Sequence, residues 1–364
     1  MQLRPTIIWT ILALLLALDL GYSLYQHRQM PMHGDLVPLV LPSEHYTQVL
    51  EEPFGFAAAI DGERYAGSNR YMIHRSLKLY FDHVPRWLQS IASPVESLYL
   101  ASALFKTILQ LLLCLVIAAY IMAAFRWRDW RYWLAVLCVS AFMQTFGFRG
   151  SMGVIDASIV YTFFYAFPLW LLLVFFFPFF QAAIHGQAVW TLKRWQQLTW
   201  PLLVVFLAFS GPLVAPLAIL VCGSLLAFYL VQKKINLAPY TTFIISLMLG
   251  ISLYSMYVGS FNLENGEGPS ILERFMLMPT GLVKMLFTKI GWPLILILFG
   301  LSLFLFVKKG FNKTYPRIWQ VILFLLALLG AYLLLLPFGG YRPYRPYIIR
   351  YDTFLPGTII MIMC

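Results

Sequence analysis

The chain is a series of long apolar stretches separated by short polar loops. Most of these stretches approach the roughly 20 residues that a helix needs to cross about 30 Å of hydrocarbon. They are continuous, which favours helices over the short alternating segments of a β-barrel. We therefore predict an all-α fold, a polytopic transmembrane helix bundle in which residues 1–364 form a single integral membrane domain. The nine full spans are expected at about Thr6–Tyr25, Leu98–Ala124, Tyr132–Phe148, Ile159–His185, Leu198–Phe209, Leu213–Val231, Tyr240–Gly259, Trp292–Val307 and Ile318–Pro337.

The last apolar stretch begins at Phe354 and predicts the start of a tenth span. Only about eleven residues follow, which is too few for a helix to cross a bilayer. We therefore expect a partial tenth span in a chain that is a fragment of a longer protein. The alternative is that this end enters the membrane against a partner protein.

Basic residues predict how the spans are oriented. If Arg4 lies in the cytoplasm, four basic loops fall on the cytoplasmic side, as the positive-inside rule requires. We therefore predict a multi-pass protein of the bacterial inner membrane with a cytoplasmic N-terminus. The four loops carry Arg126, Arg128 and Arg131; Lys193 and Arg194; Lys233 and Lys234; and Lys308, Lys309 and Lys313.

Composition agrees with membrane insertion and changes how the net charge is interpreted. Hydrophobic residues make up 61% of the chain and charged residues 11%, against about a quarter charged in a soluble domain. A net charge of +11 would suggest nucleic acid in a soluble protein. Here the basic residues lie in short loops, so we expect membrane lipids as partners and no nucleic acid. The four cysteines lie in apolar segments, so neither a disulfide framework nor a metal site is expected.

The segment 26–97 is a polar, mixed loop that the orientation places in the periplasm. Apolar residues recur at helical spacing between Tyr71 and Leu88, which predicts an amphipathic helix on the membrane surface. One interpretation is a surface cap with solvated charges. If the loop binds substrate instead, Arg64 and Arg75 are candidate substrate-binding residues.

Two aspartates are the candidate catalytic residues. Asp35 follows the first span closely, where a general base would meet the head group of a lipid carrier. It could also bind a divalent cation, which is the only candidate cofactor. Asp156 lies in the loop before the fourth span together with Arg149, a further candidate substrate-binding residue. Asp156 could equally be an N-cap of the fourth span, because aspartate is favoured there, and the two roles are compatible.

The segment 338–353 is rich in arginine, tyrosine and proline, and the orientation places it in the periplasm. Prolines stiffen its backbone, and arginine forms bidentate pairs with phosphate oxygens. Tyrosines can stack on sugar rings. The alternative is that the arginines pair with anionic lipids or with Asp352 and only anchor the ninth span. The candidate substrate-binding residues of this segment are Tyr341, Arg342, Arg345 and Arg350.

The layout resembles the GT-C superfamily of integral membrane glycosyltransferases. The resemblance lies in a cytoplasmic N-terminus, one span, a long outer loop with an acid near its start, and many further spans. It implies that Asp35 is the acid of the first loop and Asp156 that of the second outer loop. The chain departs from the family because Gly34-Asp35-Leu36 offers one carboxylate where a pair is usual. Tyr46 to Arg75 and Gly339 to Pro356 also resemble uncharacterised polytopic proteins of Bacteroidetes-type bacteria.

These observations favour transfer of a sugar from a polyprenyl-phosphate donor to an acceptor on the periplasmic side. The first alternative is a non-enzymatic accessory or structural subunit of an inner-membrane complex. The second is a lipid or solute transporter, for which the spans contain few charges.

Overall fold

A computed structural model describes residues 5–146, 149–150, 152–211, 213–288, 291–343 and 346–364. The regular secondary structure of those residues is helical, apart from one antiparallel pair of two-residue strands, β1 (Thr145–Phe146) and β2 (Arg149–Gly150). Short 3₁₀ and π segments lie at Gly34–Leu36, Ala57–Asp61, Thr162–Ala166 and Leu336–Phe338. The α-helices are α1 (Pro5–Arg28), α2 (Val37–Val40), α3 (Glu44–Glu51), α4 (Tyr71–Leu88), α5 (Pro94–Ile121), α6 (Trp130–Met143), α7 (Ile159–Tyr161), α8 (Phe167–His185), α9 (Arg194–Ala208), α10 (Val214–Leu230), α11 (Pro239–Gly259), α12 (Ile271–Thr288), α13 (Gly291–Lys308), α14 (Phe311–Thr314), α15 (Pro316–Leu335) and α16 (Leu355–Met363).

Six helical segments of the described chain are long and apolar enough to cross a membrane, so the protein has the helices of a multi-pass membrane protein. The predicted number of nine full spans is not confirmed. At about 1.5 Å per residue, a helix of 14 residues covers about 21 Å, which is less than the hydrocarbon thickness. This shortfall affects α6, α9 and α10, which have 14, 15 and 17 residues. The six segments are Ile7–Arg28, Pro94–Ile121, Ile159–His185, Pro239–Gly259, Gly291–Lys308 and Pro316–Phe338.

Helix α5 is the centre of the bundle and packs against α1, α4, α6, α8 and α16. It begins at a capping box, in which the Ser93 hydroxyl accepts from the Glu96 backbone N–H and the Glu96 carboxylate accepts from the Ser93 backbone N–H. Its buried face combines small residues with long apolar ones, which lets neighbouring helices approach closely.

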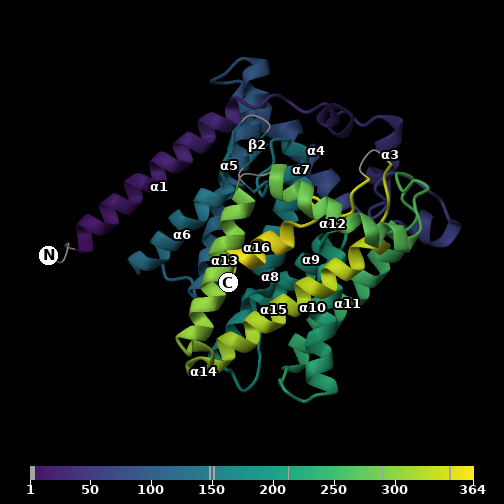
Figure 1. Cartoon of the computed structure of the whole chain (residues 1–364). Coiled ribbons are helices and arrows are strands. Elements are labelled where there is room, and N and C mark those ends of the chain that lie inside the picture. The colour runs from purple at the N-terminus through teal and green to yellow at the C-terminus, as the bar shows by residue number, and fades with distance from the viewer. Residues whose placement is uncertain (1–4, 147–148, 151, 212, 289–290, 344–345) are drawn as a thin grey trace.

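Helix α1 lies at the edge of the bundle and contacts mainly α5 and α6 (Figure 1). A polar network holds it there, because Asp19 accepts hydrogen bonds from Ser140 and from Gln144, the latter at 2.7 Å. Gln110 on α5 continues this network to Ser23 at 3.0 Å. Asp19 lies within the first predicted span, and these partners explain how an acid is tolerated there.

Loops gather at the two ends of the bundle. The upper end in Figure 1 holds residues 29–70, the loop 260–270 and residues 339–343, and backbone hydrogen bonds join Leu263 to Tyr65 and Gly266 to Tyr341. The lower end holds residues 186–193, 232–238 and 309–315, where Trp190 and Leu237 form a β-bridge. Parts of the two segments predicted to lie in the periplasm, residues 29–70 and 339–343, therefore meet the loop 260–270 at one end of the molecule.

Two helices, α4 and α12, lie in segments that are polar or mixed in the sequence. Helix α4 occupies Tyr71–Leu88, the range predicted for the amphipathic helix. The polar sequence after α11 does not form a loop as far as Pro279, because α12 begins at Ile271 and continues through Pro279. A capping pair starts that helix: Glu273 accepts from the Ser270 backbone N–H at 2.7 Å.

Candidate functional site

The centre of the upper end is a carboxylate, Glu264, that collects partners from three distant segments. Arg342 donates to one of its oxygens, and Arg70 lies 3.8 Å from the same oxygen. The Tyr46 hydroxyl donates to the other oxygen at 3.2 Å, and His45 Nε2 lies 4.0 Å from it. We call these five residues the Glu264 cluster. It ties the first loop, the loop after α11 and the segment after α15 together.

Charge and burial shift the pKa values in this cluster. Burial alone would raise the pKa of Glu264, but Arg70, Arg342, Tyr46 and His45 outweigh it, so the pKa lies below its ordinary value. Burial, and then the nearby Glu264 charge, raises the pKa of Tyr46 to about 12. The cluster therefore holds an ionised carboxylate and a neutral phenol at neutral pH.

His74 lies beneath the cluster as a buried neutral imidazole. Burial, and then the charge of Arg70, lowers its pKa to about 3. Its ring packs between Tyr46 at 5.5 Å and Phe164 at 5.0 Å, measured between ring centres. This histidine supports the cluster by packing and carries no charge above that pKa.

The segment that follows the cluster forms a compact turn. Arg350 Nε lies 3.4 Å from Asp352 Oδ1, and the Thr353 backbone N–H donates to the same oxygen at 2.8 Å. The Tyr332 hydroxyl on α15 donates to the Thr353 carbonyl at 2.9 Å. Lys284 of α12 lies 4.0 Å from the centre of the Tyr347 ring. The turn is thus fixed to α15 and α12, and Arg350 has a carboxylate partner of its own.

Asp156 is buried just before α7 and has a structural contact. Its Oδ1 accepts from the Ser158 backbone N–H at 2.7 Å, and Ser158 is the N-cap residue of α7. The carboxylate thus accepts from a backbone N–H at the start of this span, which is close to the N-cap role expected for it. Lys106 of α5 donates to the neighbouring Ala157 carbonyl, and its charge interacts with Asp156.

A cavity of about 10 Å³ lies beside Asp156, with room for about one water molecule. Asp352 and the tyrosines Tyr161, Tyr165 and Tyr351 line it. Asp156 and Asp352 therefore face the same small space although they lie far apart in the sequence.

Asp35 lies at the same end of the bundle and is exposed. Its carboxylate pairs with His33 at 3.2 Å, and the His33 ring lies 5.7 Å from the ring of Tyr161. Its charge also contributes to the raised pKa of Tyr46. Asp35 therefore lies beside both the Glu264 cluster and the Asp156 cavity, although nothing in the described chain joins it to Asp156 directly.

The other predicted substrate-binding residues have different surroundings. Tyr341 packs on Arg274, whose guanidinium lies 5.5 Å from the ring centre. Arg64 and Arg75 are exposed, and within the described ranges neither forms an ion pair. Arg149 lies in β2, and Arg345 lies outside the described residues.

Several residues of the site were not among the predicted site residues, Tyr46 and His45 of the Glu264 cluster included. Three charged ones have a weak signal in the sequence. Glu264 is one of two acids in a polar loop, Arg70 is one of many charges in the first loop, and Lys106 is a lone cation in an apolar helix. The intramembrane lysine is the one that general rules would single out. The two others become visible only when the fold brings their loops together.

The site can bind an anion and hold an exposed base near it. Arg70 Nε is buried and has no hydrogen-bond partner in the part of the chain that the structure describes, so this donor is available to a ligand oxygen. No group of three or more His, Cys, Asp or Glu side chains suited to a metal ion occurs among the described residues. The arrangement fits charge recognition with general-base chemistry at Asp35.

The chain matches no protein-family model, no curated protein and no solved structure with which we compared it.

Proposed function

We propose that the protein transfers a sugar from a polyprenyl-phosphate donor to an acceptor on the periplasmic side of a bacterial inner membrane. In this proposal the upper end faces the periplasm and the N-terminus is cytoplasmic. In this proposal all nine predicted spans cross the membrane. The helices α6, α9 and α10 are short, and the segments at their ends complete the crossing. Membrane lipids surround the bundle.

The observation that carries the proposal is that Asp35 lies at the same end of the bundle as three guanidinium groups, with Tyr46 near both Asp35 and Arg70. Arg70 and Arg342 share Glu264, so together they keep a net positive charge. Arg350 lies on the adjoining turn. Arginine recognises phosphate oxygens through paired N–H groups, and the Arg70 Nε donor supplies one that no protein group uses.

The roles follow from exposure. Asp35 is exposed and can accept a proton from an acceptor hydroxyl, whereas Asp156 is buried and bonded to the start of α7. We therefore assign Asp35 as the base and Asp156 as a positioning residue. The donor phosphate would lie against Arg70, Arg342 and Arg350. A divalent cation bound at Asp35 stays a candidate cofactor.

Transfer and binding can be tested separately. Asp35→Asn should abolish incorporation of labelled sugar in membranes while leaving expression unchanged. Arg342→Gln should remove the thermal stabilisation that undecaprenyl phosphate gives to the purified chain, with undecaprenol as the neutral control lipid. Arg64→Gln is the matched control and should keep that stabilisation. Unchanged incorporation by the Asp35 variant would refute the assigned base.

A second function is favoured by the pairing of the arginines with carboxylates. Because Arg342 contacts Glu264 and Arg350 contacts Asp352, these groups could serve to join segments of an accessory subunit. Native mass spectrometry after mild detergent extraction separates the two proposals. A stoichiometric protein partner would favour the subunit, and a co-purified polyprenyl phosphate would favour the transferase.

A further inference from the structure

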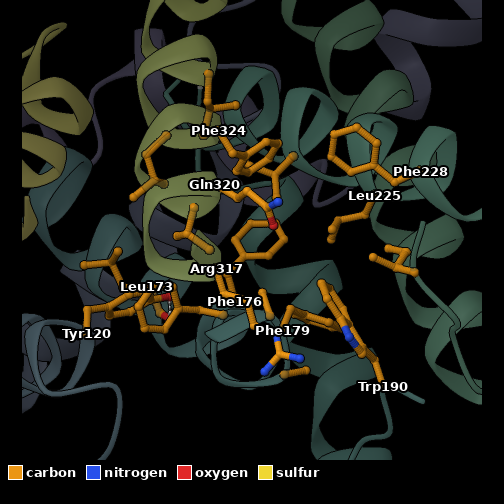
Figure 2. Close-up of a pocket in the computed structure, with 18 of the residues that line it drawn as sticks. Tyr120, Leu173, Phe176, Phe179, Trp190, Leu225, Phe228, Arg317, Gln320 and Phe324 are labelled. Carbon is orange, nitrogen blue, oxygen red and sulfur yellow. Dashed lines mark hydrogen bonds between the residues drawn. The ribbon is translucent and has the colours of Figure 1, made fainter. Parts of the chain in front are cut away.

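A large cavity lies at the lower end of the bundle, away from the Glu264 cluster. It measures about 860 Å³ and lies between α8, α10, α15 and α16 (Figure 2). Most of its wall is aliphatic or aromatic, and Figure 2 shows Phe176, Phe179 and Phe324 around it. A space of this size and polarity matches the cavities that hold organic ligands.

The polar part of the wall combines three amide side chains, Gln187, Asn236 and Gln320, with three cations. Arg317, Lys233 and Lys234 line the lower end of the cavity, and all three are exposed. No carboxylate lines it, and within the described ranges these three cations form no ion pair. Three uncompensated positive charges therefore adjoin an apolar space.

The Arg317 guanidinium is held against the end of α8. Gly186 follows that helix with φ +61°, and a Cβ at this position would collide with the guanidinium. The carbonyl end of α8 favours one positive charge nearby, but it accounts for Arg317 alone. Lys233 and Lys234 remain without such a partner.

The lining of the cavity on α15 is about as deep as one leaflet of a bilayer. The residues of α15 that line the cavity recur at helical spacing and form one face of that helix. From the cation Arg317 to the last apolar residue, Leu328, they cover about 16 Å at 1.5 Å per residue, of which the apolar part begins at Val321 and covers about 10 Å. One leaflet contributes about half of a 30 Å hydrocarbon core. The cations are thus placed at head-group level, with the apolar wall at the level of the acyl chains.

We propose that this cavity binds an anionic phospholipid from the leaflet at the lower end. The phosphate head group lies against Arg317, Lys233 and Lys234, and the acyl chains follow the face of α15. Basic pockets between membrane helices are suited to lipids with negative head groups. The site is independent of the proposed transferase activity, because it lies at the other end of the bundle and shares no residue with the Glu264 cluster.

The test uses the full chain, delipidated in mild detergent and titrated with phosphatidylglycerol or with phosphatidylcholine of the same acyl chains. Native mass spectrometry counts the bound lipids. Phosphatidylglycerol should bind more tightly, and glycerol phosphate alone should not displace it, because the acyl chains supply much of the contact. Equal binding of the two lipids, or displacement by glycerol phosphate, would overturn the proposal.

Two variants and their controls locate the binding. Each cation near an anionic head group contributes about fivefold, so Lys233→Gln, Lys234→Gln and Arg317→Gln together should weaken phosphatidylglycerol binding about a hundredfold. Lys308→Gln, Lys309→Gln and Lys313→Gln remove the same charge from exposed positions outside the cavity and should change it little. Val221→Trp fills the cavity and should remove binding of both lipids, whereas Leu202→Trp on the exposed face of α9 should not. Equal losses in a variant and its control would place the lipid elsewhere.

Discussion

The two ends of the bundle use cationic residues in different ways. At the upper end Arg70, Arg342 and Arg350 lie beside carboxylates, and the adjoining cavity measures about 10 Å³. At the lower end Arg317, Lys233 and Lys234 have no carboxylate beside them in the part of the chain that the structure describes, and they border about 860 Å³ of mostly apolar space. Arginines that share a carboxylate hold distant segments together, whereas unpaired cations above an apolar wall suit a ligand that brings its own negative charge. The two ends thus differ in what their cations do: those of the upper end hold segments in position, and those of the lower end suit recognition of a ligand.

The largest expected effect comes from removing the carboxylate at the upper end. Glu264→Ala leaves Arg70 and Arg342 partly buried without their partner, and it should lower the free energy of unfolding by about 3 kcal/mol. Glu267→Ala in the same loop is exposed and should change it by less than about 0.5 kcal/mol. Thermal unfolding in detergent measures both. Similar melting temperatures for the two variants would mean that Glu264 does not hold the loops together.

The next effect is a pH dependence that originates at His74. Its pKa in the folded protein is about 3 and its ordinary value is 6.5, so below pH 6.5 the unfolded chain takes up a proton that the folded chain does not. Stability should therefore fall by about 1.4 kcal/mol per pH unit as the pH drops from 6.5 to 4.5. Below pH 4.5 protonation of Glu264 adds to this fall in stability, because the pKa of Glu264 in the folded protein is also lowered.

His74→Gln should flatten the melting temperature between pH 6.5 and 4.5 relative to the unmodified chain. His83→Gln is the control, because that side chain is exposed on the same helix. The charged groups that face His74 are Arg70 and Glu264, and neither changes charge in that window. If both histidine variants keep the original slope, the pH dependence arises elsewhere.

The smallest effects are expected at the exposed arginines of the first loop. Arg64→Gln and Arg75→Gln should each change the melting temperature by less than Arg342→Gln, because neither has a carboxylate partner in the described chain. Surface changes of this kind are usually worth less than about 0.5 kcal/mol. A loss of undecaprenyl phosphate binding in Arg64→Gln but not in Arg342→Gln would shift the proposed site from the cluster into the loop.

The sequence predicted most helices because local patterns determine them. The range of α4 follows from its amphipathic spacing, and the long apolar spans follow from their length and hydrophobicity. The number of spans was harder to predict, because α6, α9 and α10 are apolar but too short for their length alone to decide whether they cross a membrane. The start of α12 was not predicted, although Ser270 and Glu273 form a capping pair there.

The site was harder to predict than the helices because its contacts are distant in the sequence. Arg342 was singled out from its own segment, but its partner Glu264 lies 78 residues earlier. Composition shows which charges exist, and only the fold shows which of them are neutralised by a neighbour. That is why Arg70, one of many charges in the first loop, was passed over while the exposed Arg64 and Arg75 were chosen.

Thiol labelling tests the central claim, that Asp35 and the arginine segment share one membrane face while the lipid-binding cations lie on the other. A chain without its four native cysteines would carry Asp35→Cys, Pro343→Cys, Lys234→Cys or Arg317→Cys singly, in sealed vesicles of known orientation. A membrane-impermeant maleimide should label positions 35 and 343 from one side and positions 234 and 317 from the other. Labelling of positions 35 and 343 from opposite sides would contradict the account.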